Sequence, residues 1–243
     1  MRKKIQYGVK KLSAAIALLS AELFILFVLF FISLASLIVI IRKIFYQKEN
    51  TLDDKVFNNL SGHVSSANTA VMQVFSFLGS PQFLIPAFLV FFTVIFLSYK
   101  TKWYFIKVVT VAVSNLLLMF GLKFFFNRPR PLIPLLKEVP GLSFPSGHAF
   151  MSLTFFGLII YFVYHDVANK WIKWTVIIFL MCIIFLVGLS RVYLRVHYAS
   201  DVIAGFCFGI LSLVILFLML RQIEKFNAEK IPADLNVTKA VDE

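Results

Sequence analysis

The strongest constraint in this sequence is a series of six apolar runs whose lengths match or approach a membrane crossing. About 20 apolar residues are needed for a helix to cross about 30 Å of hydrocarbon. Backbone amides in lipid find no water, so an unbroken apolar run satisfies them by forming a helix. The sequence therefore predicts an all-α protein with a bundle of six transmembrane helices, at Leu12–Ile41, Gly79–Ser98, Trp103–Leu122, Ala149–Tyr164, Trp174–Leu189 and Val202–Leu220.

Composition agrees with this interpretation. Hydrophobic residues make up 60% of the 243 residues and charged residues only 15%, whereas a soluble domain is about half apolar and about a quarter charged. The net charge of +12 is typical of a protein oriented by cytoplasmic lysines and arginines, or of one that binds an anion. No basic face stands apart from the spans, so nucleic acid is not an expected partner.

The lysines and arginines also predict an orientation. With the N-terminus inside, thirteen of them fall on the inner side and ten on the outer side, but six of the outer ten lie at 123–137 and 191–195, in or next to the polar clusters described below. The remaining imbalance predicts cytoplasmic N- and C-termini. We expect a basic cytoplasmic N-terminus at 1–11, a single membrane domain at 12–223 and a polar tail at 224–243.

The first outer connection, residues 44–78, contains a short amphipathic pattern. Val56, Phe57, Leu60 and Val64 fall on one face at helical spacing. Such a face is typical of a helix that lies in the membrane interface.

Three polar clusters interrupt the apolar pattern at matching helix ends. The third and fifth predicted helices end, and the fourth and sixth begin, on the same outer side. The clusters occupy those ends, at Lys123–Pro131, Pro145–His148 and Ser190–Asp201. Although they are remote in sequence, they are predicted to converge in space.

The content of the clusters suits a phosphate group. Lys123, Arg130 and Arg191 supply cations, and the arginine fork matches phosphate oxygens. Ser146 and Gly147 open the fourth helix, where free amides and the helix dipole bind anions. A single carboxylate is too few for a divalent metal site, so neither a metal nor another cofactor is expected.

His197, Asp201 and His148 are the candidate catalytic residues. Asp201 follows His197 by four residues and would share a face with it if that turn is helical. A carboxylate fixes the tautomer of an imidazole and stabilises its positive charge, which makes the ring a competent nucleophile. His148, at the mouth of the fourth helix, is placed to protonate a leaving group. Taken singly, each of these polar residues could also be an interfacial anchor or a helix cap.

These clusters resemble the signature of the type 2 phosphatidic acid phosphatase family, membrane enzymes related to the vanadium haloperoxidases. KFFFNRPRP separates Lys123 from Arg130 by six residues, PSGH ends at His148, and SRVYLRVHYASD separates Arg191, His197 and Asp201 by five and three residues. Arg128-Pro129 duplicates the arginine-proline pair, but the spacing favours Arg130 as the phosphate ligand.

The resemblance implies a mechanism. His197 would attack phosphorus and form a phosphohistidine, Asp201 would orient its ring, and His148 would protonate the leaving group and later activate water. The remaining members would bind the phosphate oxygens without a metal, namely Lys123, Arg130, Ser146, the Gly147 amide and Arg191. The substrate would be a lipid phosphate or pyrophosphate at the outer membrane face.

Alternatives remain open at this stage. The phosphohistidine could pass its phosphoryl group to an alcohol or sugar, which would make the chain a phosphotransferase. A transporter or lipid-binding scaffold is disfavoured, because the main polar residues within the spans (Glu22, Lys107 and Asn115) have no partners near them in sequence and transport sites lie near the midplane. Phosphatidate, phosphatidylglycerophosphate and undecaprenyl pyrophosphate share the group that the signature binds, and the sequence predicts no oligomeric state.

Overall fold

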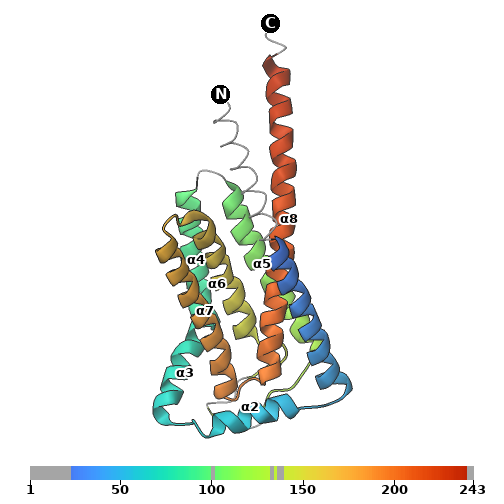
Figure 1. Ribbon diagram of the computed structural model, residues 1–243, viewed down its shortest axis with the longest axis vertical. Helices are drawn as coiled ribbons and strands as arrows, with labels where there is room; N and C mark the ends of the chain where they lie inside the picture. The colour runs from blue at the N-terminus through green and yellow to red at the C-terminus, as the bar shows by residue number, and fades with distance from the viewer. Residues whose placement is uncertain (1–22, 100–101, 132–133, 136–139, 240–243) are drawn as a thin grey trace, which may run out of the picture.

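The computed structural model describes residues 23–99, 102–131, 134–135 and 140–239 of the chain. Every regular element in these residues is a helix (Figure 1). Among the described residues, six helices are long and apolar enough to cross a membrane, so the all-α, six-span prediction is confirmed. They are Leu23–Tyr46, α4 (Pro81–Ser98), α5 (Lys102–Phe126), α6 (Gly147–Asp166), α7 (Lys170–Tyr193) and α8 (Ala199–Lys239).

The observed helices are longer than several predicted spans. α6 starts two residues before Ala149 because Ser146 caps it and accepts a hydrogen bond from the Ala149 amide. α7 starts at Lys170 because Asn169 caps it, accepting from the first amides of the helix. Hydropathy marks the apolar stretch of a helix, whereas capping side chains mark its end. The first residues of the predicted Leu12–Ile41 span lie outside the described part of the chain.

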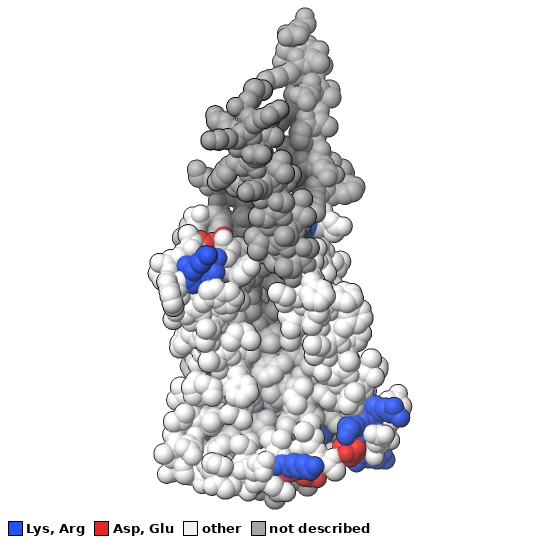
Figure 2. Space-filling model, viewed as in Figure 1, with Lys and Arg blue, Asp and Glu red and all other residues white. Residues whose placement is uncertain are grey.

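α6 is the centre of the bundle, since it contacts α4, α5, α7 and α8. Buried apolar clusters join its residues to α5 and α8 on one side and to α4 and α7 on the other. Many large apolar side chains elsewhere face outward, among them Phe124 at 87% exposure. On the face drawn in Figure 2, charged side chains gather toward the two ends of the bundle and leave the described surface between them uncharged, as a membrane band requires.

The first outer connection contains two helices. The first transmembrane helix ends in a π-helical turn, η1 (Arg42–Tyr46), and α2 (Thr51–Ser61) then lies across the end of the bundle (Figure 1). α3 (Ser66–Leu78), which the sequence did not predict, packs against α7 and leads to α4.

The amphipathic face of α2 is turned toward protein. Val56, Phe57 and Leu60 pack on a buried cluster from the ends of α6, α7 and α8. Val64 lies beyond the helix and is 41% exposed, so its predicted place on this face is wrong. α2 therefore covers the end of the bundle at which the three polar clusters lie.

The polar tail continues the last helix. α8 extends to Lys239, well past the apolar stretch that ends at Ile223. At about 1.5 Å per residue, its 41 residues exceed the thickness of a bilayer. In Figure 1 this extension leaves the bundle at the end opposite α2.

Candidate active site

The three polar clusters meet beneath α2, and backbone hydrogen bonds join them. The Ser146 amide donates to the carbonyl of Asp201 at 3.0 Å, which connects the start of α6 to the start of α8. The Ser143 amide donates to the carbonyl of Arg128 at 2.8 Å, which connects the segment before α6 to the segment after α5. The predicted convergence is therefore observed.

His197 and Asp201 form an imidazole–carboxylate pair. His197 lies in the loop between α7 and α8, and Asp201 lies in the first turn of α8. Nδ1 of His197 is 3.6 Å from Oδ2 of Asp201, and both side chains are almost fully buried. The two residues do not share a helical turn, contrary to the premise of the prediction. They meet because the loop folds back, with the His197 amide donating to the carbonyl of Arg191 at 3.2 Å.

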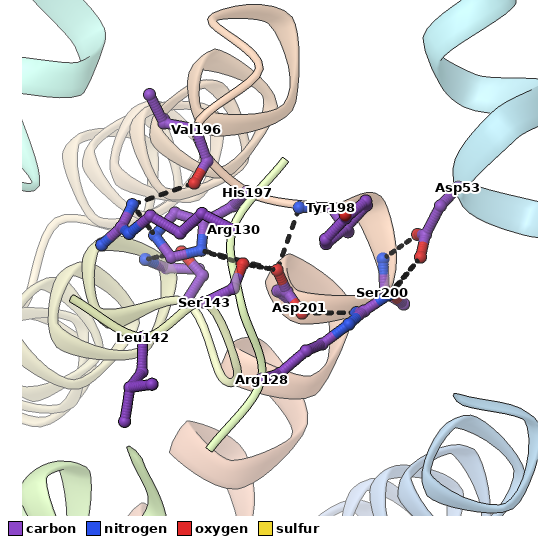
Figure 3. Close-up of polar contacts among 12 residues, drawn as sticks. Asp53, Arg128, Arg130, Leu142, Ser143, Val196, His197, Tyr198, Ser200 and Asp201 are labelled. Atoms are coloured by element: carbon purple, nitrogen blue, oxygen red, sulfur yellow. Dashed lines mark hydrogen bonds and ion pairs between the residues drawn. The ribbon is translucent and has the colours of Figure 1, made fainter. Parts of the chain in front are cut away.

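The surroundings of His197 define its tautomer. Nη1 of Arg130 lies 3.3 Å from Nε2 of His197 (Figure 3). A guanidinium only donates, so Nε2 must accept and Nδ1 must carry the proton toward Asp201. The lone pair of Nε2 therefore faces the guanidinium of Arg130.

Burial keeps the His197 ring neutral. Its side chain is 1% exposed, and this burial lowers the pKa from 6.5 to about 4, outweighing Asp201, which raises the pKa. Arg130 and Arg191 lower the pKa of His197 further. At neutral pH the ring is uncharged, which is the form that can act as a nucleophile.

This pKa predicts how stability depends on pH. Between about pH 6.5 and 4, His197 binds a proton when unfolded but not when folded, so the free energy of unfolding falls as the pH drops through this range. From pH 7 to pH 5, we expect the free energy of unfolding of the wild-type protein to fall by about 2 kcal/mol more than that of a His197→Gln variant. SDS titrations in mixed micelles at both pH values measure this difference. If the free energy of unfolding fell by the same amount in both proteins between pH 7 and pH 5, a neutral buried His197 would be contradicted.

Arg130 and Lys123 lie at the half-buried mouth of the site. Arg130 donates to the carbonyl of Val196 at 2.9 Å and to that of Gly141 at 3.2 Å. Burial lowers the pKa of the Arg130 guanidinium, while Asp201 raises it. Nζ of Lys123, in the last turn of α5, donates to the carbonyl of Leu142 at 2.7 Å. These protein contacts hold both cations beside His197 and the start of α6.

Arg191 contributes a third cation from the end of α7. Its side chain is 6% exposed, and its Nη1 donates to the hydroxyl of Ser76 on α3. Its Nε is buried and has no hydrogen-bond partner among the described residues. Because an unpaired buried donor is costly, a bound anion would satisfy an unmet requirement of this side chain.

The start of α6 completes the site. Ser146 is fully buried and caps the helix, which is the second role that the sequence allowed for it. Gly147 is the first helical residue. The side chain of Lys123 passes beside Gly147, with Cε 3.7 Å from the point that a Cβ on Gly147 would occupy. His148 lies within electrostatic range of both Arg191 and His197. The arrangement combines a helix N-terminus, three cations and two imidazoles, which can bind a phosphate group and transfer a phosphoryl group.

Comparison with known proteins identifies the family. A family model described as the PAP2 superfamily matches residues 103–225, just over half of the chain and all three polar clusters. The chain belongs to the PAP2 superfamily. It is 33% identical over 158 residues to phosphatidylglycerophosphatase B of Bacillus subtilis (strain 168), which corresponds to 65% of this chain and 77% of that protein.

Two solved structures share the fold of this PAP2 chain. One is the first transmembrane PAP2 type phosphatidylglycerolphosphate phosphatase from Bacillus subtilis, with a TM-score of 0.68 and 27% identity over 79% of this chain and 94% of that one. The other is LpxE of Aquifex aeolicus, with a TM-score of 0.52 and 26% identity over 67% and 93% of the two chains. The chain is thus a multi-pass membrane phosphatase of the PAP2 lipid phosphatase type.

The structure of this PAP2 enzyme separates the two neighbouring arginines. Arg130 lies beside the His197 ring, as the motif spacing favoured. Arg128 instead forms ion pairs with two buried carboxylates, 2.6 Å from Asp201 and 3.0 Å from Asp53. The duplicated arginine-proline pair was the one sequence signal for Arg128, and no signal pointed to Asp53 on α2.

Three serines near the site were also missed. Ser143 donates to Asp201, Ser200 donates to Asp53, and Ser76 accepts from Arg191. None of them lies at a motif position that the chemistry singled out. In the described part of the chain, no group of three or more His, Cys, Asp or Glu residues is arranged to hold a metal ion.

Proposed function

We propose that this PAP2 enzyme hydrolyses a phosphomonoester or pyrophosphate of a membrane lipid through a phosphohistidine at His197. One observation carries the proposal. The buried, neutral His197 ring turns Nδ1 toward Asp201 and Nε2 toward the guanidinium of Arg130. The nucleophile His197 therefore has its orienting carboxylate, Asp201, at one ring nitrogen and an oxyanion-binding cation, Arg130, at the other.

The first chemical step forms a P–N bond and breaks a P–O bond. Nε2 of His197 attacks phosphorus in line, and the P–O electron pair leaves with the lipid alkoxide or phosphate. His148 donates a proton to this leaving group. Asp201 stabilises the positive charge that develops on the His197 ring. A bound phosphate would take over the Arg130 hydrogen bond that Nε2 now accepts, which frees the lone pair for attack.

The second step reverses the roles. His148, now neutral, takes a proton from water, the water oxygen attacks phosphorus, and the P–N bond breaks to release inorganic phosphate. In both steps the non-transferred oxygens carry negative charge that the fixed donors of the site stabilise. We assign this task to Lys123, Arg130, Ser146, the Gly147 amide and Arg191.

We infer that the site faces the outer side of the membrane. The imbalance of lysines and arginines outside the site clusters supports cytoplasmic N- and C-termini. The basic residues 1–11 and the polar residues 224–243 would then lie on the cytoplasmic side of a single membrane domain, residues 12–223. A lipid phosphate head group would reach the site from the outer leaflet while its acyl chains stay in the bilayer.

Transfer of radiolabel to the enzyme tests the mechanism. We expect detergent-solubilised enzyme mixed with ³²P-labelled phosphatidylglycerophosphate, in the presence of EDTA, to acquire a base-stable, acid-labile label on the peptide that contains His197. This lipid is tested first because two similar proteins are named as phosphatases of phosphatidylglycerophosphate. Phosphatidate and undecaprenyl pyrophosphate are the other two substrates to test. Labelling of another residue, or a strict need for a divalent metal, would contradict the proposal. Phosphate release that is unchanged by added alcohols or sugars distinguishes hydrolysis from phosphotransfer.

A further inference from the structure

A chain of buried charges links α2 to the nucleophile. Asp53 is 1% exposed, although it lies on a short helix at the end of the bundle. Its carboxylate accepts from the Ser200 amide at 2.8 Å, from the Ser200 hydroxyl at 2.7 Å and from Nη2 of Arg128 at 3.0 Å. Nη1 of Arg128 donates in turn to Oδ1 of Asp201 at 2.6 Å (Figure 3).

This chain of contacts fixes the rotation of the Asp201 carboxylate. Arg128 holds Oδ1, while Oδ2 accepts from the Tyr198 amide at 3.0 Å and from the Ser143 hydroxyl. Oδ2 is thereby turned toward Nδ1 of His197. Arg128 is itself held in place, because its guanidinium lies 4.0 Å from the ring centre of Tyr198. The orientation of the His197 ring therefore depends on an arginine outside the phosphate site.

Charge balance gives Asp53 a specific task. Arg128 carries one positive charge between two carboxylates, so its field is divided between Asp53 and Asp201. If Asp53 lost its charge, Arg128 would act on Asp201 alone and weaken its ability to stabilise a positive His197 ring. Buried charges interact strongly, so this redistribution is felt at the nucleophile.

We propose that Asp53 and Arg128 are positioning residues that orient and electrostatically tune Asp201 for the attack by His197. The inference rests on the proposed function, in which His197 is the nucleophile. It assigns α2 a role in the reaction, because α2 supplies the carboxylate that keeps Arg128 in place.

A competing explanation is that Asp53 only caps α8. Its Oδ1 accepts from the amide of Ser200, the second residue of that helix, and a carboxylate at a helix start is stabilising in its own right. Asp53→Asn distinguishes the two, because asparagine keeps an oxygen that can accept from this amide but loses the charge and the second acceptor oxygen that Arg128 and the Ser200 hydroxyl use. A capping role predicts reduced stability with normal turnover, whereas a positioning role predicts reduced turnover.

The experiment is a double-mutant cycle between Asp53→Asn and Asp201→Asn, measured as phosphate release from a lipid phosphate in detergent. We expect Asp53→Asn alone to lower kcat about tenfold with KM within about twofold, since coupling within one buried network is of this order. On the Asp201→Asn background, the same change should lower kcat by no more than about twofold, because the group through which Asp53 acts is gone. Asp54→Asn is the matched control, since Asp54 is the exposed neighbour on the same helix and should leave kcat unchanged.

The outcomes separate this inference from the proposed function. A normal kcat for Asp53→Asn, or an equal loss on both backgrounds, overturns the positioning role and leaves the nucleophilic role of His197 standing. If Asp53→Asn fails to accumulate as folded protein, Arg128→Lys replaces it in the cycle. Lysine keeps the positive charge but cannot donate to Asp53 and Asp201 in the fixed geometry of a guanidinium. A loss of kcat that disappears on the Asp201→Asn background supports the inference, and an additive loss overturns it. The nucleophile itself is tested by replacing His197.

Discussion

Replacing His197 with alanine is expected to lower phosphate release from a lipid phosphate at least about 10⁴-fold, because removal of a nucleophile costs more than removal of any group that assists it. No neighbouring side chain can take over the attack without rebuilding the site. His197 is almost fully buried, with Nδ1 facing Asp201 and Nε2 facing Arg130. Release of inorganic phosphate from detergent-solubilised enzyme measures the effect.

His63→Ala is the matched control for this prediction. His63 lies in the exposed turn between α2 and α3, and its ring contacts only the carbonyl of Asn59 among the hydrogen bonds of the described chain. Its replacement should leave phosphate release within about twofold, as is usual for surface substitutions. Activity retained by His197→Ala, with folding verified by its elution as a single species in detergent, would end the assignment of His197 as nucleophile.

The membrane-spanning part of the fold was predictable because lipid imposes one rule on every span. A backbone that must satisfy its own hydrogen bonds in hydrocarbon forms a helix, so apolar run length is enough to find it. Apolar run length does not detect a helix whose sequence contains many polar residues. α3 was missed because serine, asparagine, threonine and glutamine interrupt its apolar residues and its 13 residues are too few to span a bilayer.

The core of the candidate site was predictable from chain direction. Helices of alternating direction bring the end of α5 and the starts of α6 and α8 to one side, and each carries a polar cluster. The supporting residues were not predictable in this way. Asp53 and Ser200 are 147 residues apart in sequence, and nothing in a single sequence marks two such residues as neighbours. Arg128 illustrates the limit, since the duplicated arginine-proline pair gave it no role of its own and its ion-pair partners are two carboxylates.

A glycine that the sequence did not single out is also expected to be sensitive to substitution. Gly205 lies on α8 directly against the start of α6. A Cβ at this position would lie 2.8 Å from the carbonyl oxygen of Ser146, 3.2 Å from Cβ of Ala149 and 3.3 Å from the amide of Phe150. Two of these three atoms are backbone, so relief of the overlap requires the first turn of α6 to move. Small residues allow this kind of close helix approach in membranes.

Gly205→Ala is therefore predicted to lower kcat/KM for a lipid phosphate about 10²-fold, since misplacement of reacting groups by about 1 Å costs this much. The displaced turn carries Ser146, Gly147 and His148, which would shift relative to His197. Gly121→Ala is the control, because Gly121 lies in α5 with no atom within 4 Å of its added Cβ, and alanine favours a helix by about 1 kcal/mol over glycine. Since alanine also favours the helix at Gly205, a loss of activity there reflects the packing of α8 against α6. Equal activity of the two variants would show that the start of α6 tolerates displacement, and the close approach of α8 would then have no part in catalysis.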